Sequence, residues 1–359
     1  GDAIDAEIKR VLEQLETARK TEATIEVEGE RVKVTNLDKE FWPAHGDTPP
    51  RTKGDLIAYY ARVAKWMLPH LRDRPLTLTR YPNGVKGQLF YQKHYAQPIP
   101  SFVATTRIWS TDNQENGTYL MCNNLPSLIW LAQIADLEIH AWMSSINPEP
   151  DAVGRKLSAE GSRADARESI LNFPDYMIFD LDPYIYSGEE KKGAEPEFNR
   201  RAWEKAVSVA LDLKDILDQL KLSSFVKTTG KTGIHIYAPI LRDYTYDDVR
   251  EFSRLIGVQL RSQRPNDVTM EWDTSKRTGK IFYDHNQNTF GKQLAAQYSL
   301  RPTPWAGVSM PVLWSELAKA DPIAFDIDSV PQRLAKTGDP WADILAHKND
   351  LSALIGSKG

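Results

Sequence analysis

The order of predicted elements between residues 175 and 290 is the feature that most constrains the fold. The apolar run YMIFDLDPY (176–184) predicts a strand, and RRAWEKAVSVALDLKDILDQL predicts a helix with one apolar face. SSFVKTTG and GIHIYAPI then predict two strands joined by a tight turn, YDDVREFSRLIGVQLRSQ a second helix, and VTMEWD with GKIFYD a closing hairpin. This β-α-β-β-α-β order plus one extra strand is typical of the split βαβ, or ferredoxin-like, unit. We therefore predict an α+β fold.

Two aspartates end the first strand of this unit. Asp180 and Asp182 are two positions apart and so share one face of the strand. The first and third strands are central neighbours in this topology, which places both aspartates beside His235, and Asp284 ends the last strand. Three converging carboxylates suit Mg²⁺ or Mn²⁺ better than zinc, and two such ions would support phosphoryl transfer. From these residues alone, an aspartate pair that caps a loop or binds arginines remains the alternative.

The segment KTTGKTGIH (227–235) offers groups that bind phosphate. It supplies two hydroxyls, a lysine and a glycine-containing turn whose amides can face an anion. The triplet GKT is not a P-loop, because Phe225 stands where the first glycine of that motif belongs and a strand follows instead of a helix.

The remainder of the chain predicts a second set of elements. Residues 2–20 have helical apolar spacing, and TIEVEGERVKV predicts a hairpin. A helix is expected from near Lys53, and another from about Leu125 that leads into a strand carrying Glu138 and His140. The polar stretch YSGEEKKGAEPEFNR (186–200) predicts a solvated loop.

Composition limits the class of protein. A chain of 359 residues with 41% hydrophobic content can bury a large core in two or more lobes. No uncharged apolar run is long enough to span a membrane and no signal peptide is visible, so we expect a cytoplasmic protein without membrane contact. The net charge of −4 requires any nucleic-acid binding to come from a local basic surface. The single cysteine, Cys122, is expected in the core.

Three segments carry a family resemblance. FDLDP, TTGKTGIHIYAP and GKIFYDHNQN resemble motifs I, II and III of the archaeo-eukaryotic primase superfamily, in the branch of the polymerase domain of bacterial DNA ligase D and its stand-alone relatives. VTNLDKEFWP, TRYPNGVKGQLFYQK, WLAQIADLEIH and YSLRPTPWAGVSMPVLWSEL resemble further segments in the same order, so the match covers roughly residues 34 to 320.

The resemblance implies a domain organisation. A split βαβ module packs on a second α/β module to form a catalytic domain at residues 34–330, with the metal site within 175–290. Residues 1–33 form a helix and hairpin extension, and residues 331–359 form a helical tail. We expect a stand-alone primase-polymerase, with an excised domain as the second choice.

The resemblance also assigns roles to residues. Asp180, Asp182 and Asp284 correspond to the metal-binding catalytic acids. The usual lysine of motif II falls at Thr232, with Lys231 one place earlier. The residues expected to bind the nucleotide are Thr229, Lys231, Thr232, His235, His140, Lys280, Gln287 and Arg301. Those expected to bind nucleic acid are Asn36, Lys39, Lys53, Phe90, Tyr91, Lys93 and Arg277, with Lys39 and Lys53 on a template 5′-phosphate and the aromatic pair stacked on the template.

The function implied by the resemblance is DNA-dependent nucleotidyl transfer. We expect extension of primers at short gaps or broken ends during DNA repair, with a preference for ribonucleotides and a requirement for Mn²⁺ or Mg²⁺. The expected partners are gapped or broken duplex DNA with a 5′-phosphate, NTPs or dNTPs, a separate DNA ligase and an end-binding protein, at the nucleoid.

Two alternatives belong to other classes. A haloacid-dehalogenase-type phosphatase also begins with D-x-D, but Tyr184 stands where that motif expects threonine or valine, and LFYQK, LEIH and GIH stay unexplained. The other alternative is a DNA-end-binding module without activity, which the retention of all three carboxylates argues against.

Overall fold

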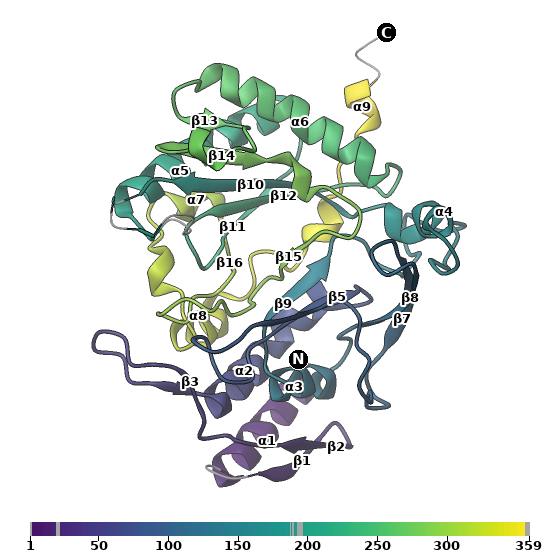
Figure 1. Ribbon diagram of the computed structural model, residues 1–359, viewed down its shortest axis with the longest axis vertical. Helices are drawn as coiled ribbons and strands as arrows, with labels where there is room; N and C mark the ends of the chain where they lie inside the picture. The colour runs from purple at the N-terminus through teal and green to yellow at the C-terminus, as the bar shows by residue number, and fades with distance from the viewer. Residues whose placement is uncertain (1, 19–21, 187, 189, 192–196, 356–359) are drawn as a thin grey trace.

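Two β-sheets organise the molecule, the larger in the upper half of Figure 1 and the smaller below it. The computed structural model describes residues 2–18, 22–186, 188, 190–191 and 197–355. The predicted α+β class is confirmed, since helices and sheets are both present throughout.

The larger sheet contains the split βαβ unit. Its strand order is β13-β14-β10-β12-β11-β16. The four strands β14, β10, β12 and β11 pair antiparallel in the order that the ferredoxin-like topology requires, which confirms the prediction. The elements of this module are β10 (Tyr176–Tyr184), α5 (Arg200–Gln219), β11 (Phe225–Thr228), β12 (Ile234–Pro239), α6 (Tyr246–Gln263), β13 (Val268–Thr269), β14 (Lys280–Asp284) and β16 (Met310–Val312).

Helices α5 and α6 cover one face of this sheet. The Tyr283 hydroxyl donates to the carbonyl oxygen of Ser253 on α6 at 2.6 Å, and Tyr283 is the register partner of Leu181. Leu181 therefore faces the helices. Because side chains alternate along a strand, Asp180 and Asp182 face the opposite side, toward the second sheet.

The predicted closing hairpin is wrong. Strand β13 runs parallel to β14, with Val268 opposite Ile281 and Thr269 opposite Phe282. Residues 270–279 cross back between the two strands and include a short 3₁₀ turn, Thr274–Lys276, so the chain enters β14 in the direction of β13. A two-residue turn would have given an antiparallel pair, but this link is much longer.

The smaller sheet has the order β15-β9-β5-β6. Strand β9 follows α3 directly, as predicted, and carries Glu138 and His140. The elements of this part are β3 (Glu40–Trp42), β4 (Arg51–Thr52), α2 (Lys53–Leu71), β5 (Leu76–Arg80), β6 (Phe90–Gln92), β7 (Thr105–Ser110), β8 (Glu115–Leu120), α3 (Leu125–Gln133), β9 (Asp136–Trp142), α4 (Arg163–Glu168) and β15 (Gln293–Ala295). Cys122 is buried, as expected.

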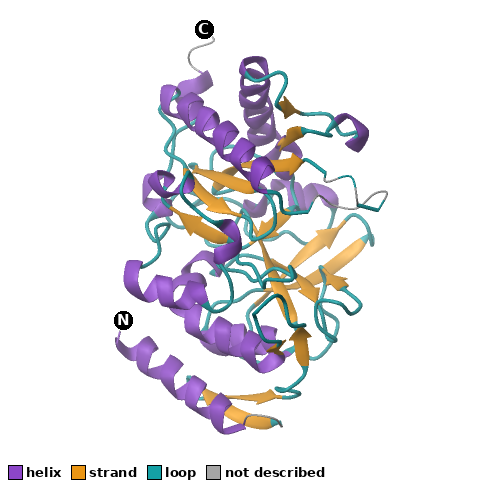
Figure 2. Cartoon of the chain, turned by 90° about the vertical axis from the view of Figure 1, so that its left-hand side faces the viewer, coloured by secondary structure: helices purple, strands orange, loops and turns teal. Residues whose placement is uncertain are grey.

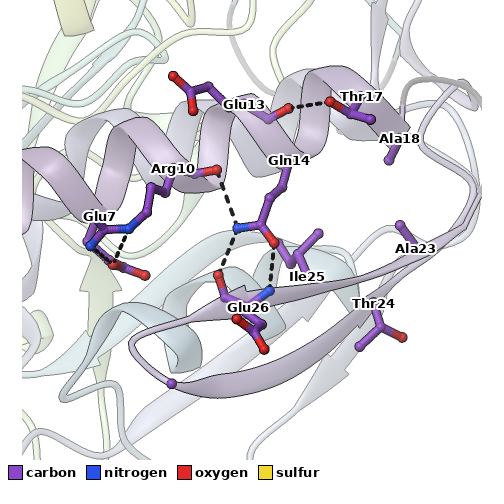
Figure 3. A pocket seen from close by; sticks show the side chains of 11 residues that line it. Glu7, Arg10, Glu13, Gln14, Thr17, Ala18, Ala23, Thr24, Ile25 and Glu26 are labelled. Atoms are coloured by element: carbon purple, nitrogen blue, oxygen red, sulfur yellow. Dashed lines mark hydrogen bonds and ion pairs between the residues drawn. The ribbon is translucent and has the colours of Figure 1, made fainter.

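The N-terminal extension forms the predicted helix and hairpin, at the bottom of Figures 1 and 2. These elements are α1 (Asp2–Ala18), β1 (Ala23–Val27) and β2 (Glu30–Val34). Figure 3 shows the Gln14 side chain bonded to both backbone groups of Glu26, at 2.9 and 2.8 Å. The cavity beside this contact, about 710 Å³, lies between α1 and β1 and shares no residue with the cavity that holds the aspartates.

The C-terminal segment packs on the larger sheet. Helices α7 (Trp314–Leu317), α8 (Ser329–Thr337) and α9 (Ser352–Ile355) occupy it. The Trp341 side chain is fully buried and donates its Nε1 hydrogen to the carbonyl oxygen of Val226 on β11 at 3.1 Å. Lys348 bonds to Asp175 and Asp151, both at 2.7 Å. Residues 338–351 thus stabilise the sheet that carries the acids.

Two sequence expectations concern loops and membranes. Within the predicted solvated loop, residues 187, 189 and 192–196 lie outside the described residues, and those described have no helix or strand before α5. None of the described helices combines the length and the apolar character needed to cross a membrane.

Candidate active site

Four charged or titratable side chains form a row across the larger sheet. Asp180 on β10 is the direct register partner of Asp284 on β14 and of His235 on β12, and His235 is in turn opposite Lys227 on β11. Side chains in directly opposed positions share a face. The sheet therefore brings together two of the predicted acids and the predicted histidine, from three distant parts of the sequence.

The acids are buried and repel one another. Asp180 is 4% exposed and Asp284 6%. Burial, followed by the neighbouring charge of Asp284, raises the pKa of Asp180 to about 7. Burial, followed by the charge of Asp180, also raises the pKa of Asp182 well above its usual value. Carboxylates held in this way favour a bound cation.

The donor set fits a hard divalent cation. The buried Oδ1 of Asp180 has no hydrogen-bond partner, and it lies 3.3 Å from Nε2 of His235. Across the described residues, no three acid, histidine or cysteine side chains already enclose a metal position. The orphaned oxygen and the carboxylate ligands nevertheless match the chemistry of Mg²⁺ or Mn²⁺.

A glycine makes room for Asp182. A Cβ atom on Gly233 would lie 2.6 Å from the carbonyl oxygen of Leu181 and 2.8 Å from Oδ1 of Asp182. Any side chain at position 233 would therefore displace the second aspartate.

The turn between β11 and β12 is organised by Thr229. Its Oγ1 accepts hydrogen bonds from the amides of Lys231, at 3.2 Å, and Gly233, at 3.1 Å. The expectation that the amides of this turn face an anion is therefore wrong for these two positions, because Thr229 already occupies them. Side chains rather than these amides must contact a phosphate here.

Arg301, which lines the same cavity as Asp180 and Asp182, forms an ion pair with Glu138. Arg301 donates from Nε to Oε1 of Glu138 and from Nη1 to the carbonyl oxygen of Thr229, both at 2.5 Å. His140 Nε2 lies 3.6 Å from Oε2 of Glu138, and Lys231 Nζ lies 4.0 Å from Oε1. Burial raises the pKa of Glu138, but Arg301 and then His140 outweigh burial and lower it below the usual value. Glu138 thus gathers three cationic or titratable side chains toward the acids.

One cavity of about 270 Å³ holds most of the predicted site residues. The predicted residues that line it are His140, Asp180, Asp182, Thr229, Lys231, Thr232, His235, Gln287 and Arg301. Asp284 lies beside it and accepts a 3.0 Å hydrogen bond from Nε2 of Gln287. Lys280 is not part of this lining. It begins β14 opposite Tyr184, at the other end of the strand from Asp284.

Two residues of this site were not predicted. Glu138 and His140 are two positions apart in LEIH and therefore share one face of the strand. This shared face is the sequence feature that could have identified Glu138. Lys227 is completely buried and donates from Nζ to the carbonyl oxygen of Ala295 at 2.5 Å and to Oγ of Ser309 at 2.7 Å. It thereby ties β11 to strand β15 of the smaller sheet. The sequence KTTG does not indicate that its lysine is buried.

Lys39 and Lys53 lie together, because the chain between them folds back on itself. Strands β3 and β4 pair antiparallel, and the amide of Lys53 donates to the carbonyl oxygen of Lys39 at 2.8 Å. Burial, then the charges of Lys39 and Arg80, lower the pKa of Lys53 to about 8. Crowded cations of this kind favour an anion.

The first turn of α2 does not contribute free amides to an anion site at these two lysines. The amide of Gly54 donates to the carbonyl oxygen of Leu37 at 2.9 Å, and that of Asp55 to Oγ1 of Thr52 at 3.1 Å. Asn36 is exposed nearby and has a positive φ of 54°. Recognition of an anion would therefore depend on the ammonium groups.

Phe90 and Tyr91 lie on β6, the edge strand of the smaller sheet, and are 42% and 54% exposed. Neither ring is a core residue. Gln293 Nε2 donates to the Tyr91 hydroxyl at 2.7 Å, which orients that ring. Lys93 pairs with Asp112 at 3.6 Å.

Arg277 is buried, although the resemblance placed it against the primer or nucleotide. Its guanidinium donates to the carbonyl oxygens of Glu271 and Trp272 and to the Tyr184 hydroxyl, at 2.8, 2.6 and 2.8 Å. It also stacks 3.6 Å from the centre of the Phe282 ring. In this arrangement Arg277 holds the 270–279 loop against β10 and β14.

Known proteins are similar to this chain in sequence. The family model of the LigD primase-polymerase domain matches residues 52–341. The chain is 30% identical over 329 residues to the multifunctional non-homologous end joining protein LigD of Mycolicibacterium smegmatis, covering 92% of the chain and 37% of that protein. It is 28% identical over 329 residues to the bifunctional non-homologous end joining protein LigD of Bacillus subtilis, covering 90% of the chain and 46% of that protein. The chain thus spans less than half the length of these curated relatives.

A solved structure is also similar. The polymerase domain of Mycobacterium tuberculosis ligase D in complex with DNA matches with a TM-score of 0.72 and 28% identity, covering 89% of this chain and 99% of that one. Fold and site together define a DNA nucleotidyltransferase of the primase-polymerase type. The chain belongs to the LigD primase-polymerase domain family. This membership argues against the phosphatase alternative.

Proposed function

We propose that the chain extends primers at gaps or broken ends of DNA by metal-dependent nucleotidyl transfer. The observation that carries this proposal is the position of Asp180, between Asp284 and His235, with a buried carboxylate oxygen that has no hydrogen-bond partner. Asp180, Asp182 and Asp284 would hold two Mn²⁺ or Mg²⁺ ions. When bound, the ions would activate the primer hydroxyl and neutralise charge on the triphosphate.

The other residues of the cavity suit the triphosphate. The cavity is lined by Arg301, Lys231, His235 and Thr232. Glu138 holds Arg301 in place, so the guanidinium is oriented before a nucleotide binds. Gln287 orients Asp284 through the Nε2 hydrogen bond. These side chains would bind and align the nucleotide, which is the main requirement of phosphoryl transfer.

The substrate we propose is gapped or broken duplex DNA with a downstream 5′-phosphate. Lys39 and Lys53 would bind the phosphate, and the exposed rings of Phe90 and Tyr91 would stack on template bases. The relatives named above are end joining proteins. We extend that role to this chain, with a DNA ligase and an end-binding protein as partners at the nucleoid.

A preference for ribonucleotides is the most specific part of the proposal. It rests on family membership rather than on a particular side chain at the 2′-hydroxyl. Single-turnover extension with matched NTP and dNTP would test it. Equal rates, or faster extension with the dNTP, would contradict the preference without affecting the nucleotidyl transfer itself.

One assay separates the main function from its alternatives. The protein is incubated with gapped DNA, Mn²⁺ and a labelled nucleoside triphosphate. Primer extension supports the proposal, release of inorganic phosphate without extension supports a phosphatase, and binding without either reaction supports a DNA-end-binding module.

A further inference from the structure

A short segment of the chain leads from strand β15 to Arg301, and Tyr298 lies in it. Tyr298 is fully buried and has a φ of 71°, in the left-handed region that residues with a large side chain seldom adopt. A strained conformation of this kind persists only where several contacts hold it. The contacts of Tyr298 therefore decide how the chain reaches Arg301.

Helix α2 holds the backbone of this segment. The Tyr59 hydroxyl donates to the carbonyl oxygen of Tyr298 at 2.7 Å, and the amide of Tyr298 donates to the carbonyl oxygen of Ser309, also at 2.7 Å. Two residues further on, the amide of Leu300 donates to the Tyr60 hydroxyl at 3.0 Å. Tyr59 and Tyr60 are both fully buried on α2, so the helix fixes the main chain of the segment.

The Tyr298 side chain is held by Asp339, from the C-terminal segment. The Tyr298 hydroxyl donates to Oδ1 of Asp339, which also accepts from the amide of Trp341 at 2.9 Å. The other carboxylate oxygen, Oδ2, lies 2.6 Å from Nε2 of His70 on α2, and the His70 and Asp339 side chains are 4% and 3% exposed. Burial, followed by the charge of Asp339, raises the pKa of Tyr298 well above its usual value. The hydroxyl therefore keeps its proton and remains a donor.

The Arg301 side chain has little room to move independently of its main chain. A Cβ atom on Gly230 would lie 2.7 Å from Cγ of Arg301, and Arg301 is 8% exposed. The amide of Arg301 donates to the carbonyl oxygen of Gly307 at 2.8 Å, and its guanidinium is bonded to Glu138 and Thr229. Because the side chain is enclosed along its length, the position of the guanidinium depends on the main chain that carries it.

We propose that Tyr298 is a positioning residue for Arg301. Asp339 and His70 hold Tyr298 in the conformation that places the arginine guanidinium beside the triphosphate of an incoming nucleotide. The inference rests on the proposed function for the identity of that ligand. It assigns a role in nucleotide binding to Asp339, which is not among the residues that line the cavity with the aspartates. The competing account is that these contacts only stabilise the fold.

Steady-state extension of gapped DNA with Mn²⁺ and a matched nucleotide tests the proposal. Tyr298→Phe removes only the hydroxyl. We expect the KM for the nucleotide to rise at least fivefold, with kcat and the affinity for gapped DNA within twofold of the wild type. This pattern indicates the loss of a contact that is equally strong in the ground state and the transition state.

A second buried tyrosine supplies the matched control. Tyr246 is 1% exposed, and its hydroxyl bonds to Oγ of Ser144 at 3.0 Å. Tyr246→Phe and Tyr298→Phe each remove one buried hydroxyl and should lower the melting temperature to a similar extent. Only Tyr298→Phe should raise the KM, because a loss of stability alone would affect both variants alike.

Two further comparisons separate positioning from stability. Asp339→Ala should raise the KM at least as much as Tyr298→Phe. Asp339→Asn keeps an oxygen that can accept from the Tyr298 hydroxyl and should stay within twofold of the wild type. Arg301→Lys should raise the KM on its own. Adding Tyr298→Phe to it should raise the KM less than twofold further, because Tyr298 acts through Arg301.

Three results would overturn the proposal: a wild-type KM in Tyr298→Phe, an equal rise in Tyr246→Phe, or independent effects of Tyr298→Phe and Arg301→Lys. If Asp339→Ala does not fold, Tyr298→Phe and Asp339→Asn still decide the outcome. A wild-type protein that extends no primer would refute the proposed function instead. Direct titration of a nucleoside triphosphate with Mn²⁺ then tests the positioning role, since Tyr298→Phe should lower the affinity at least fivefold. Equal affinities of the wild type and Tyr298→Phe would refute that role.

Discussion

Asp180 and Asp284 are direct register partners on β10 and β14, so two buried carboxylates lie side by side in the sheet. Asp180→Asn removes one of the two charges. At pH 8 without metal, we expect the free energy of unfolding to rise by roughly 1–3 kcal/mol, since one pKa unit corresponds to about 1.4 kcal/mol. Mn²⁺ should raise the melting temperature of the wild type but not that of the variant. A variant destabilised without metal, yet still stabilised by Mn²⁺, would contradict this account of the acids.

The phosphate preference should depend on pH through Lys53. The pKa of this lysine is lowered to about 8, so its ammonium is present below pH 8 and is lost as the pH rises through that value. The ratio of affinities for 5′-phosphate and 5′-hydroxyl ends should therefore be constant between pH 6.5 and 7.5 and fall above pH 8. An ordinary surface lysine would keep the ratio constant to about pH 10. Binding measurements at one fixed ionic strength distinguish the two.

A substitution gives this prediction a control. Lys53→Met removes the buried ammonium and should raise the melting temperature while abolishing the 5′-phosphate preference at all pH values. Loss of stability in Lys53→Met would show that the lysine is structural. A pH-dependent preference that survives in this variant would place the titrating group elsewhere.

Gly233→Ala should impair catalysis without affecting DNA binding. The new Cβ atom would meet the carbonyl oxygen of Leu181 and Oδ1 of Asp182 at distances too short for contact, so Asp182 must move. We expect the extension rate to fall at least tenfold, with the affinity for gapped DNA within twofold of the wild type. Wild-type rates in a correctly folded Gly233→Ala protein would show that the position of Asp182 is not critical.

Phe90 and Tyr91 offer a test of template stacking. Substituting each ring with alanine should weaken binding to gapped DNA by about 1–3 kcal/mol for each base that then lacks its stacking partner. Because both rings are exposed, the melting temperature should change little. Tyr91→Phe removes only the hydroxyl that accepts from Gln293 and should have a smaller effect. Unchanged DNA affinity in Phe90→Ala/Tyr91→Ala would exclude stacking on this edge.

Local patterns were sufficient to predict the order of the four central strands of the larger sheet. Alternation and helix period located β10, β11, β12 and β14, and the ferredoxin-like topology then placed Asp180 beside His235. The direction of β13 was not predictable in this way. It depends on the 270–279 loop, which Arg277 holds through contacts with β10 and β14.

Other features depend on contacts between distant segments. Lys227 reaches Ala295 and Ser309, and Glu138 reaches Arg301, so neither role is visible in a local window. The amides of Gly54 and Asp55 at the start of α2 are not free, because Leu37 and Thr52 accept their hydrogen bonds. A family resemblance predicts which residues have a functional role. The burial and the hydrogen-bond partners of each side chain decide what it can contact.

The most direct test of the central claim is single-turnover extension of a gapped DNA primer with Mn²⁺ and a matched nucleotide. Asp180→Asn and Asp284→Asn are compared with Asp136→Asn. Asp136 is a suitable control because it is an equally buried aspartate on β9, with a pKa raised by burial and one oxygen without a partner. We predict a loss of at least a thousandfold in the first two variants, near wild-type rates in Asp136→Asn, and DNA affinity preserved in all three. Extension by Asp180→Asn or Asp284→Asn at rates close to the wild type would contradict the claim that these carboxylates form the catalytic centre.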